Sequence, residues 1–83
     1  MAEYLTAPTI DGKVQQFIGV LIQLPAEEID NSYDFKSISE GRVEYFDIMM
    51  AEALTTYFNV PTEVSDIEAM NTVQDIVNRV NNA

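Results

Sequence analysis

Apolar residues recur at helical spacing in the first third of the chain. Their positions, i, i+4, i+7, i+8, i+11 and i+12, lie on one face of a helix. The members of this face are Ile10, Val14, Phe17, Ile18, Leu21 and Ile22. Thr9 or Asp11 can cap the start of the helix, because either side-chain oxygen can accept a bond from a free backbone N–H group. Pro25 is expected to end the helix, because proline disfavours helical geometry at the residue before it.

A polar, turn-rich segment follows the first helix. The stretch AEEIDNSYDFKS is expected to form a long ordered loop, held by the isolated apolar residues Ile29, Tyr33 and Phe35. A second helix is expected to begin near Ser37. Ser37 and Glu40 have the spacing of a capping box, although Ser39 could equally be the N-cap.

The second helix has its own apolar face. The face is formed by Val43, Phe46, Met50, Leu54 and Tyr57 and is widened by Ile48, Met49, Ala53 and Phe58. Asn59 and Pro61 are expected to end this helix. Two shorter helices follow, for which the candidate caps are Ser65 with Glu68 and Thr72 with Asp75. The pattern predicts an all-α, four-helix bundle over residues 9–83 with a long first loop and a short third helix, after a flexible tail over residues 1–8.

Composition excludes several classes of protein. The chain has 83 residues, enough for one domain, and 47% of them are hydrophobic, so a packed core is expected. No stretch approaches the roughly 20 apolar residues that a membrane-spanning helix needs. The first residues lack the basic and apolar regions of a secretory signal, and we expect a cytoplasmic protein. Cysteine and histidine are absent, which excludes disulfides, Cys/His zinc sites and catalysis by either residue. We expect no enzyme activity, no catalytic residues and no metal site.

The charge of the chain restricts its partners. The net charge is −10, from 14 acidic and 4 basic residues. Nucleic acids and anionic membranes would repel such a chain, so the expected partner is a basic protein surface. The alternative is that the acids only keep a small protein soluble. We expect a monomer when the chain is free of its partner.

The order of these elements resembles the acyl carrier protein family. The segment VQQFIGVLIQLPAEEIDNSYDF is similar to the family's first helix and loop, with a Glu-Glu-aliphatic step at Glu27 and an aromatic residue at Phe35. The segment from Ile48 to Val60 resembles the second helix of the family, and MNTVQDIVNRV resembles its last helix. The resemblance covers roughly residues 9–82 and implies the carrier fold.

The chain departs from the family at the chemical centre. The resemblance implies an Asp-Ser-Leu motif at the start of the second helix, whose serine carries 4′-phosphopantetheine. The corresponding position is Val43 or Glu44, and neither residue can accept the group. The nearest hydroxyls are those of Ser39 and Ser37, which can instead act as helix caps. We expect no cofactor; under the alternative, Ser39 is the candidate attachment site for 4′-phosphopantetheine.

Acidic residues mark the candidate docking face. Glu40, Glu44, Asp47 and Ala51 are spaced at i, i+4, i+7 and i+11, which predicts one exposed stripe on the second helix. Glu52 lies to one side of this stripe and Arg42 lies beside it. The resemblance implies that partner enzymes recognise this helix through their own basic residues. The alternative is a merely solvated face.

One further motif, that of a calcium-binding loop, is only partly matched by the sequence. Asp30, Ser32 and Asp34 have the spacing of a calcium-binding loop, but Phe35 and Gly41 stand where the loop needs its glycine and its closing glutamate.

Three functional hypotheses follow. The first is a non-catalytic, carrier-like protein that docks on a biosynthetic enzyme through its acidic second helix without carrying a phosphopantetheine arm. The alternative is a divergent carrier of fatty-acid, polyketide or nonribosomal peptide synthesis, modified at Ser39 or Ser37. The third is an unrelated acidic adaptor or inhibitor that binds a basic partner.

Overall fold

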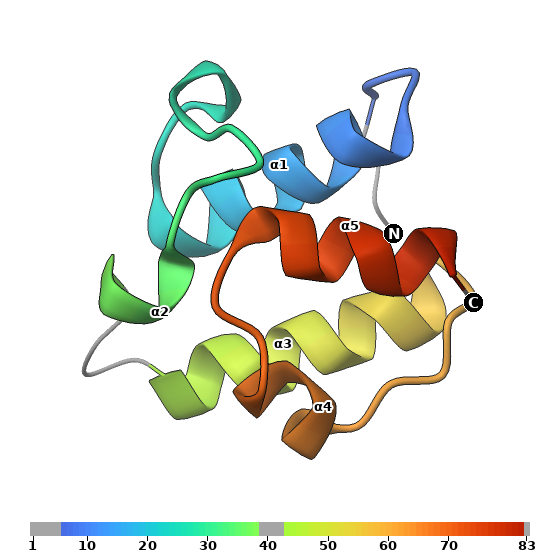
Figure 1. Cartoon of the computed structure of the whole chain (residues 1–83). Coiled ribbons are helices and arrows are strands. Elements are labelled where there is room, and N and C mark those ends of the chain that lie inside the picture. The colour runs from blue at the N-terminus through green and yellow to red at the C-terminus, as the bar shows by residue number, and fades with distance from the viewer. Residues whose placement is uncertain (1–5, 39–42, 83) are drawn as a thin grey trace.

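The chain folds into a small bundle of α-helices. The computed structural model describes residues 6–38 and 43–82. The elements in chain order are α1 (Ile10–Ile22), the 3₁₀ helix η1 (Ala26–Glu28), α2 (Phe35–Ile38), α3 (Val43–Thr56), α4 (Val64–Glu68) and α5 (Val73–Asn81) (Figure 1). The described residues form no strand, only an isolated bridge between Asp34 and Thr72. The predicted all-α class is confirmed, and none of the helices described is long and apolar enough to cross a bilayer.

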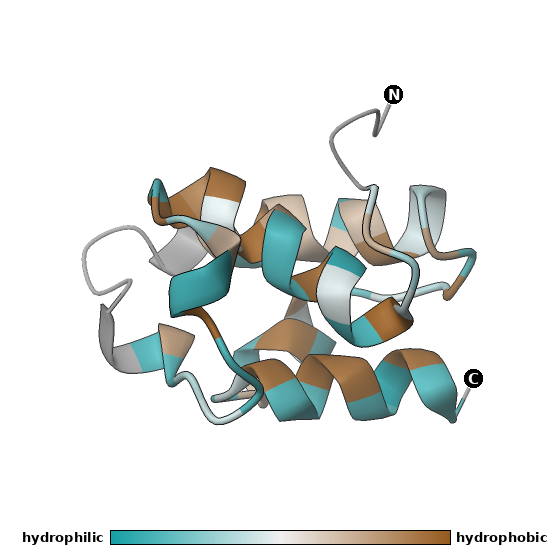
Figure 2. Cartoon of the chain, turned by 90° about the horizontal axis from the view of Figure 1, so that it is seen from above, coloured by the Kyte–Doolittle hydropathy of each residue, from teal (hydrophilic) through white to brown (hydrophobic). Residues whose placement is uncertain are grey.

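One hydrophobic core joins the helices. α1 packs against α5, and α3 packs against α4. Apolar and polar bands alternate along α5 because only one side of this helix faces the core (Figure 2). The rings of Phe35 and Phe46 stack with centroids 4.8 Å apart, which joins α2 to α3. The fully buried residues include Val14, Ile18, Phe35, Met50, Leu54, Ile67, Val73 and Ile76.

The first helix begins as predicted and ends shortly before Pro25. The Oγ1 of Thr9 accepts a bond of 3.0 Å from the backbone N–H of Gly12, so Thr9 is the cap. Gln23 adopts a left-handed conformation with φ of 64°, and Leu24 donates a backbone bond of 2.9 Å to the carbonyl of Gly19. The helix thus ends before Leu24, as expected for a helix that is followed by Pro25. The left-handed conformation of Gln23 sets the last helical residue at Ile22, and Pro25 then precedes η1.

The long loop is held by hydrogen bonds as well as by its apolar anchors. Ile29 and Phe35 are buried, and Tyr33 is partly buried, as expected. The side chain of Asn31 accepts a bond from Gln15 (2.8 Å) and donates to Asp11 (2.8 Å). The backbone carbonyl of Asn31 also accepts a bond of 2.8 Å from the N–H of Gln74. The loop is thus tied to α1 and α5 at once, and it contains η1 and α2, which periodicity did not predict.

The caps of the last two helices differ in how well they were predicted. Thr72 and Asp75 form the expected box, in which Thr72 N–H donates to the Asp75 carboxylate at 3.1 Å. For α4, the box uses Glu63 and Asp66, with Glu63 N–H donating to the Asp66 carboxylate at 2.9 Å. The prediction of Ser65 with Glu68 is wrong because the cap lies two residues earlier, at Glu63, and the helix begins at Val64.

The start and end of the second long helix also differ from expectation. Ser37 lies inside α2 and so does not begin this helix, and Ser39 and Glu40 lie outside the described residues. α3 ends at Thr56, and Asn59 takes a left-handed conformation with φ of 60°. The expected role of Asn59 near the helix end is consistent with this conformation.

The segment before α1 is held against it at its last residues. Ala7 N–H donates a bond of 3.0 Å to the side chain of Gln16, and the Lys13 ammonium donates to the Ala7 carbonyl. Thr6 accepts a further bond from Gln16 at 3.2 Å. The expected tail is therefore tied to α1 at Thr6 and Ala7.

Candidate functional site

The predicted acidic stripe on the second long helix is not an exposed stripe. Asp47 is only 1% exposed and Ala51 is buried as well. Both residues lie toward the interior because α3 packs against α4 and contacts α2 through Phe46 and Asp47. The prediction that Asp47 offers its carboxylate to a partner is therefore wrong. Glu40 and Arg42 lie outside the described residues, and the side chain of Glu44 is likewise not described.

Asp47 is instead part of a junction between three helices. Its Oδ2 atom lies 4.0 Å from Lys36 Nζ on α2 and accepts no hydrogen bond in the described structure. Lys36 Nζ also donates to the carbonyls of Ile67 (3.5 Å) and Glu68 (3.2 Å) at the end of α4. Burial raises the pKa of the Asp47 carboxyl; the positive charge of Lys36 partly offsets this shift, and the negative charge of Glu68 adds to it. This geometry joins α2, α3 and α4 and indicates a structural role.

The side of α3 that does face solvent carries large apolar residues. Tyr45 is 59% exposed and Ile48 is 45% exposed, whereas Met49 is half-buried. One turn further on, Glu52 is exposed and makes no hydrogen bond or ion pair within the described part of the chain. We call these four residues, Tyr45, Ile48, Met49 and Glu52, the α3 face. Of the predicted partner-binding residues, only Glu52 is shown to lie on this exposed side.

The apolar members of the α3 face were not identified as functional from the sequence. Ile48 and Met49 were assigned to the core side of the helix, and Tyr45 was not assigned to a face. The sequence nevertheless contained a sign that some apolar residues would be exposed. Successive residues of a helix are turned by about 100°, and the apolar positions of α3 extend around more than half of the helix. A helix with apolar residues over so wide an arc either is fully buried or presents some of them to solvent.

A small hollow adjoins the α3 face where α3 meets α1. Its volume is about 230 Å³, and it is lined by Phe17, Met49, Glu52, Ala53, Thr56 and Tyr57. The rings of Phe17 and Tyr57 meet edge to face with centroids 6.1 Å apart. We call this site the α1–α3 hollow.

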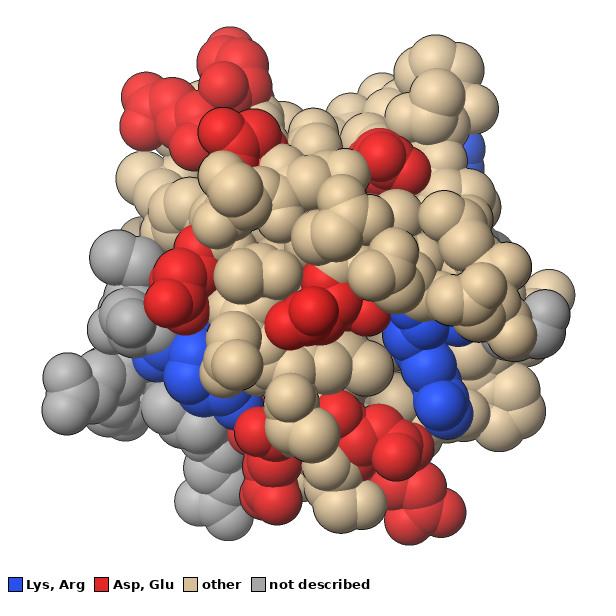
Figure 3. Space-filling view, in the orientation of Figure 1, with Lys and Arg blue, Asp and Glu red and all other residues tan. Residues whose placement is uncertain are grey.

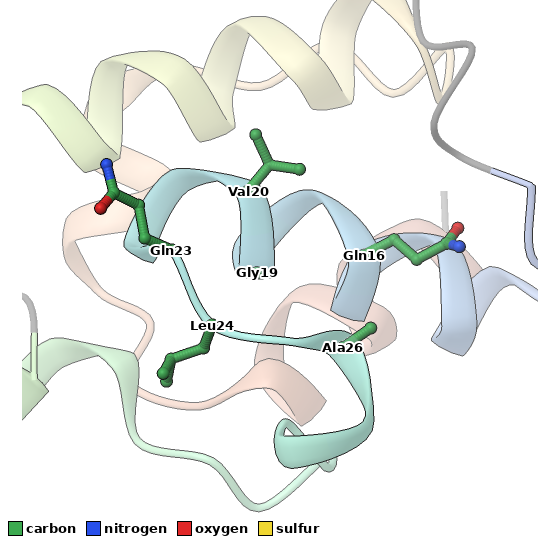
Figure 4. A pocket seen from close by; sticks show the side chains of 6 residues that line it. All are labelled: Gln16, Gly19, Val20, Gln23, Leu24 and Ala26. Atoms are coloured by element: carbon green, nitrogen blue, oxygen red, sulfur yellow. The ribbon is translucent and has the colours of Figure 1, made fainter.

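Two other hollows in the described part of the chain each include a polar side chain that already has a partner within the fold. One, of about 290 Å³, lies at the end of α1 and is lined by Gln16, Gly19, Val20, Gln23, Leu24 and Ala26 (Figure 4). The amide of Gln16 is bonded to Thr6 and Ala7, and Gly19 has no side chain. The other, of about 590 Å³, includes Arg79, whose Nη2 donates to the Pro61 carbonyl at 2.7 Å and lies 3.5 Å from the Asp66 carboxylate.

The candidate metal loop forms a simple turn. The Asp30 carboxylate accepts bonds from the hydroxyl (2.7 Å) and the backbone N–H (3.0 Å) of Ser32, and these bonds lower its pKa. No group of three or more metal-ligating side chains occurs within residues 6–38 and 43–82. The candidate attachment residue Ser39 lies outside those ranges.

On the face shown in Figure 3, acidic side chains are not gathered into one patch. Figure 3 shows Asp and Glu in several separate groups over the face in view, with Lys and Arg between some of them. The charge of the molecule therefore forms a general negative field and does not by itself identify a binding site.

Comparison with known proteins does not name a family. No protein-family model matches the chain, and neither a curated protein nor a solved structure matches it. The resemblance to acyl carrier proteins remains a prediction from the residues.

Proposed function

We propose that this chain is a non-catalytic docking domain that binds a partner protein through the α3 face. The observation that supports this proposal most strongly is the joint exposure of Tyr45 (59%) and Ile48 (45%) on one side of one helix, next to Met49. Single exposed apolar residues are ordinary, but contiguous apolar surface bordered by polar residues is typical of protein interaction sites. Tyrosine and methionine are also enriched in such interfaces.

The charge of the chain supports a basic partner. The net charge of −10 would attract a basic surface over a distance of about a Debye length, roughly 10 Å at 0.1 M salt. Glu52 lies on the face itself, and we include Glu40, Arg42 and Glu44, which lie close by in sequence, among the candidate contact residues. We propose that the partner is a biosynthetic enzyme of the cytoplasm, since the family resemblance implies such an enzyme. We also propose that docking requires no phosphopantetheine arm, because neither Val43 nor Glu44 can accept one.

Capture of the partner with variants of the face tests this function. The tagged protein is used to capture binding proteins from the native host, and the bound proteins are quantified by mass spectrometry. Tyr45→Ser and Ile48→Ser should each reduce capture of the partner at least tenfold, because truncating an anchor residue at the centre of an interface costs about 2 kcal/mol or more. Ile10→Ser is the matched control, because Ile10 is an exposed apolar residue of α1. Equal capture by all three variants would refute docking through the α3 face.

The alternative function is that of a divergent carrier modified at Ser39 or Ser37. The observation that favours it is position: both serines precede α3 in sequence, and the free N–H groups at a helix start tolerate a phosphate. Incubation with coenzyme A and a broad-specificity phosphopantetheinyl transferase, followed by intact mass measurement, tests it. We expect no gain in mass. A gain of one phosphopantetheine that is lost in Ser39→Ala or Ser37→Ala would establish the carrier.

A further inference from the structure

The α1–α3 hollow combines an aromatic and aliphatic lining with one carboxylate. Phe17 and Ala53 are buried, and Met49 and Tyr57 complete the apolar lining. Tyr57 is 38% exposed, so part of its ring is open to a ligand. Glu52 and Thr56 supply the polar side of the hollow, and both are exposed.

The size of the hollow restricts its ligand. Its volume of about 230 Å³ lies below the range of about 300–1,000 Å³ that is typical of sites for drug-sized molecules and cofactors. A single long side chain is a better match. The lining selects the type of side chain, because an apolar stem can lie along Met49 and Ala53 while its end reaches the carboxylate of Glu52.

The negative charge of Glu52 favours a side chain whose end is positively charged. Glu52 has no partner within the described structure, and the hollow is lined by no basic residue. A carboxylate beside an exposed aromatic ring favours arginine over lysine. The planar guanidinium group can bond a carboxylate with two N–H donors and stack on a ring at the same time, which an ammonium group cannot.

A second copy of this chain is poorly suited to supply that arginine. Two molecules with a net charge of −10 each repel one another. The described basic residues are also engaged within the fold: Lys13 with the Ala7 carbonyl, Lys36 with the end of α4, and Arg79 with the Pro61 carbonyl. Arg42, the fourth basic residue of the chain, lies outside the described residues, so the repulsion between copies is the argument that favours an arginine from a different, basic protein.

We propose that the α1–α3 hollow binds an arginine side chain of the partner, with its guanidinium group on the Glu52 carboxylate and against the ring of Tyr57. This inference rests on the proposed docking function and adds to it the anchor residue that the partner must present. It also identifies α1, through Phe17, as part of the binding surface.

Titration with small arginine analogues, followed by NMR of the backbone amides, tests the inference on the isolated protein. The probes are N-acetyl-arginine amide and N-acetyl-citrulline amide, which have nearly the same shape but differ in charge. We expect the arginine probe to shift the amides of Met49, Glu52, Ala53 and Tyr57 with a dissociation constant in the millimolar range. We expect the citrulline probe to bind at least tenfold more weakly.

Two variants and one control locate the effect. Glu52→Gln should weaken binding of the arginine probe at least fivefold, and Tyr57→Leu should weaken it about threefold, because each variant removes one contact of the guanidinium group. Glu28→Gln removes the same charge from exposed η1 and should leave the titration unchanged. Tyr57→Leu can disturb the packing on Phe17, so the exposed Glu52→Gln variant decides the result. Equal binding of both probes, or equal weakening by Glu52→Gln and Glu28→Gln, would overturn the inference.

The outcomes distinguish this inference from the proposed function. If the hollow fails to prefer arginine while Ile48→Ser still abolishes capture of the partner, the docking function stands and the arginine site is wrong. If the hollow prefers arginine but Tyr45→Ser and Ile48→Ser leave capture unchanged, the docking face is wrong and the arginine site stands as a separate feature.

Discussion

At the level of single residues, Asp47 has the least usual environment. Its carboxylate is buried between α2, α3 and α4, one of its oxygens accepts no hydrogen bond in the described structure, and the ammonium group of Lys36 lies 4.0 Å away. An ion pair at this distance in a buried position does not fully compensate for the loss of water around the charge. The ionised form of Asp47 is therefore unfavourable in the folded protein, which is the reason for its raised pKa.

We predict that Asp47→Asn stabilises the protein at neutral pH and not in acid. The pKa of Asp47 is raised above 3.8 in the fold, so folding favours its protonated form. Well below pH 3.8, Asp47 is protonated in both the folded and the unfolded state and does not affect the free energy of unfolding. As the pH rises from 3.8 through the folded-state pKa, the native protein loses stability that the variant keeps. Lys36 keeps its bonds to the carbonyls of Ile67 and Glu68 in the variant, so urea unfolding at pH 7 and at pH 3 should show a gain in stability at pH 7 only. An equal or larger gain at pH 3 would contradict this account.

Asp75→Asn should have the opposite effect. Bonds from the backbone N–H groups of Asn71 and Thr72 lower the pKa of Asp75, so its ionised form is favoured in the fold. This contribution is present above the unfolded-state value of 3.8 and is lost as the pH falls through the folded-state pKa. The variant should lose about 1 kcal/mol at pH 7, a typical value for a helix cap, and less in acid. The same urea series checks this result, and a pH-independent loss would contradict it.

At the level of elements, most helices could be predicted but several of their ends could not. Regular apolar spacing was sufficient for α1, α3 and α5, because each buries one side against the same core. α2 has only four residues and so carries no periodic signal. The end of α1 depends on a left-handed residue, and Gln23 is not a residue that normally indicates one. The cap of α4 uses Glu63, which is outside the residues that commonly cap helices.

The candidate site was less predictable than the fold for a related reason. Helical spacing places Asp47 and Ala51 on one stripe, but whether that stripe is exposed depends on which helices pack against it. The position of α2 beside α3 could not be known from the spacing, and this position buries Asp47. The exposure of Tyr45 and Ile48 is the other consequence of the same packing.

Substitution of Gly19 tests the close contact between the end of α1 and Leu24. A Cβ atom at Gly19 would lie 2.6 Å from the backbone carbonyl oxygen of Leu24, which cannot move without disturbing the turn at Gln23. Gly19→Ala should therefore destabilise the protein by about 1–3 kcal/mol, as overpacking does, although alanine is the better helix former.

Val20→Ala is the control for this contact. Val20 follows Gly19 in the same helix and is 52% exposed, so the substitution adds no atom against Leu24. As a change at the surface, it should alter stability by no more than about 0.5 kcal/mol. Thermal unfolding of both variants checks the pair, and equal losses would show that the contact with Leu24 is not the cause.

At the level of the whole molecule, charge and apolar surface have different roles. The acidic groups are spread over the face shown in Figure 3 and would attract a basic partner from a distance, whereas we propose that the α3 face determines where that partner binds. We predict that raising the salt concentration from 50 to 500 mM slows association with the partner at least tenfold, because screening weakens the attraction. Stopped-flow or surface-binding kinetics would measure this rate, and dissociation should change much less.

Site-specific photo-crosslinking tests the docking face most directly. A benzoylphenylalanine residue is placed at position 48 on the α3 face, and in separate proteins at exposed positions 74 and 27, on α5 and η1. We predict that one partner protein is crosslinked strongly from position 48 and at least tenfold more weakly from positions 74 and 27. Equal crosslinking from all three positions, or crosslinking from position 74 alone, would contradict docking through the α3 face.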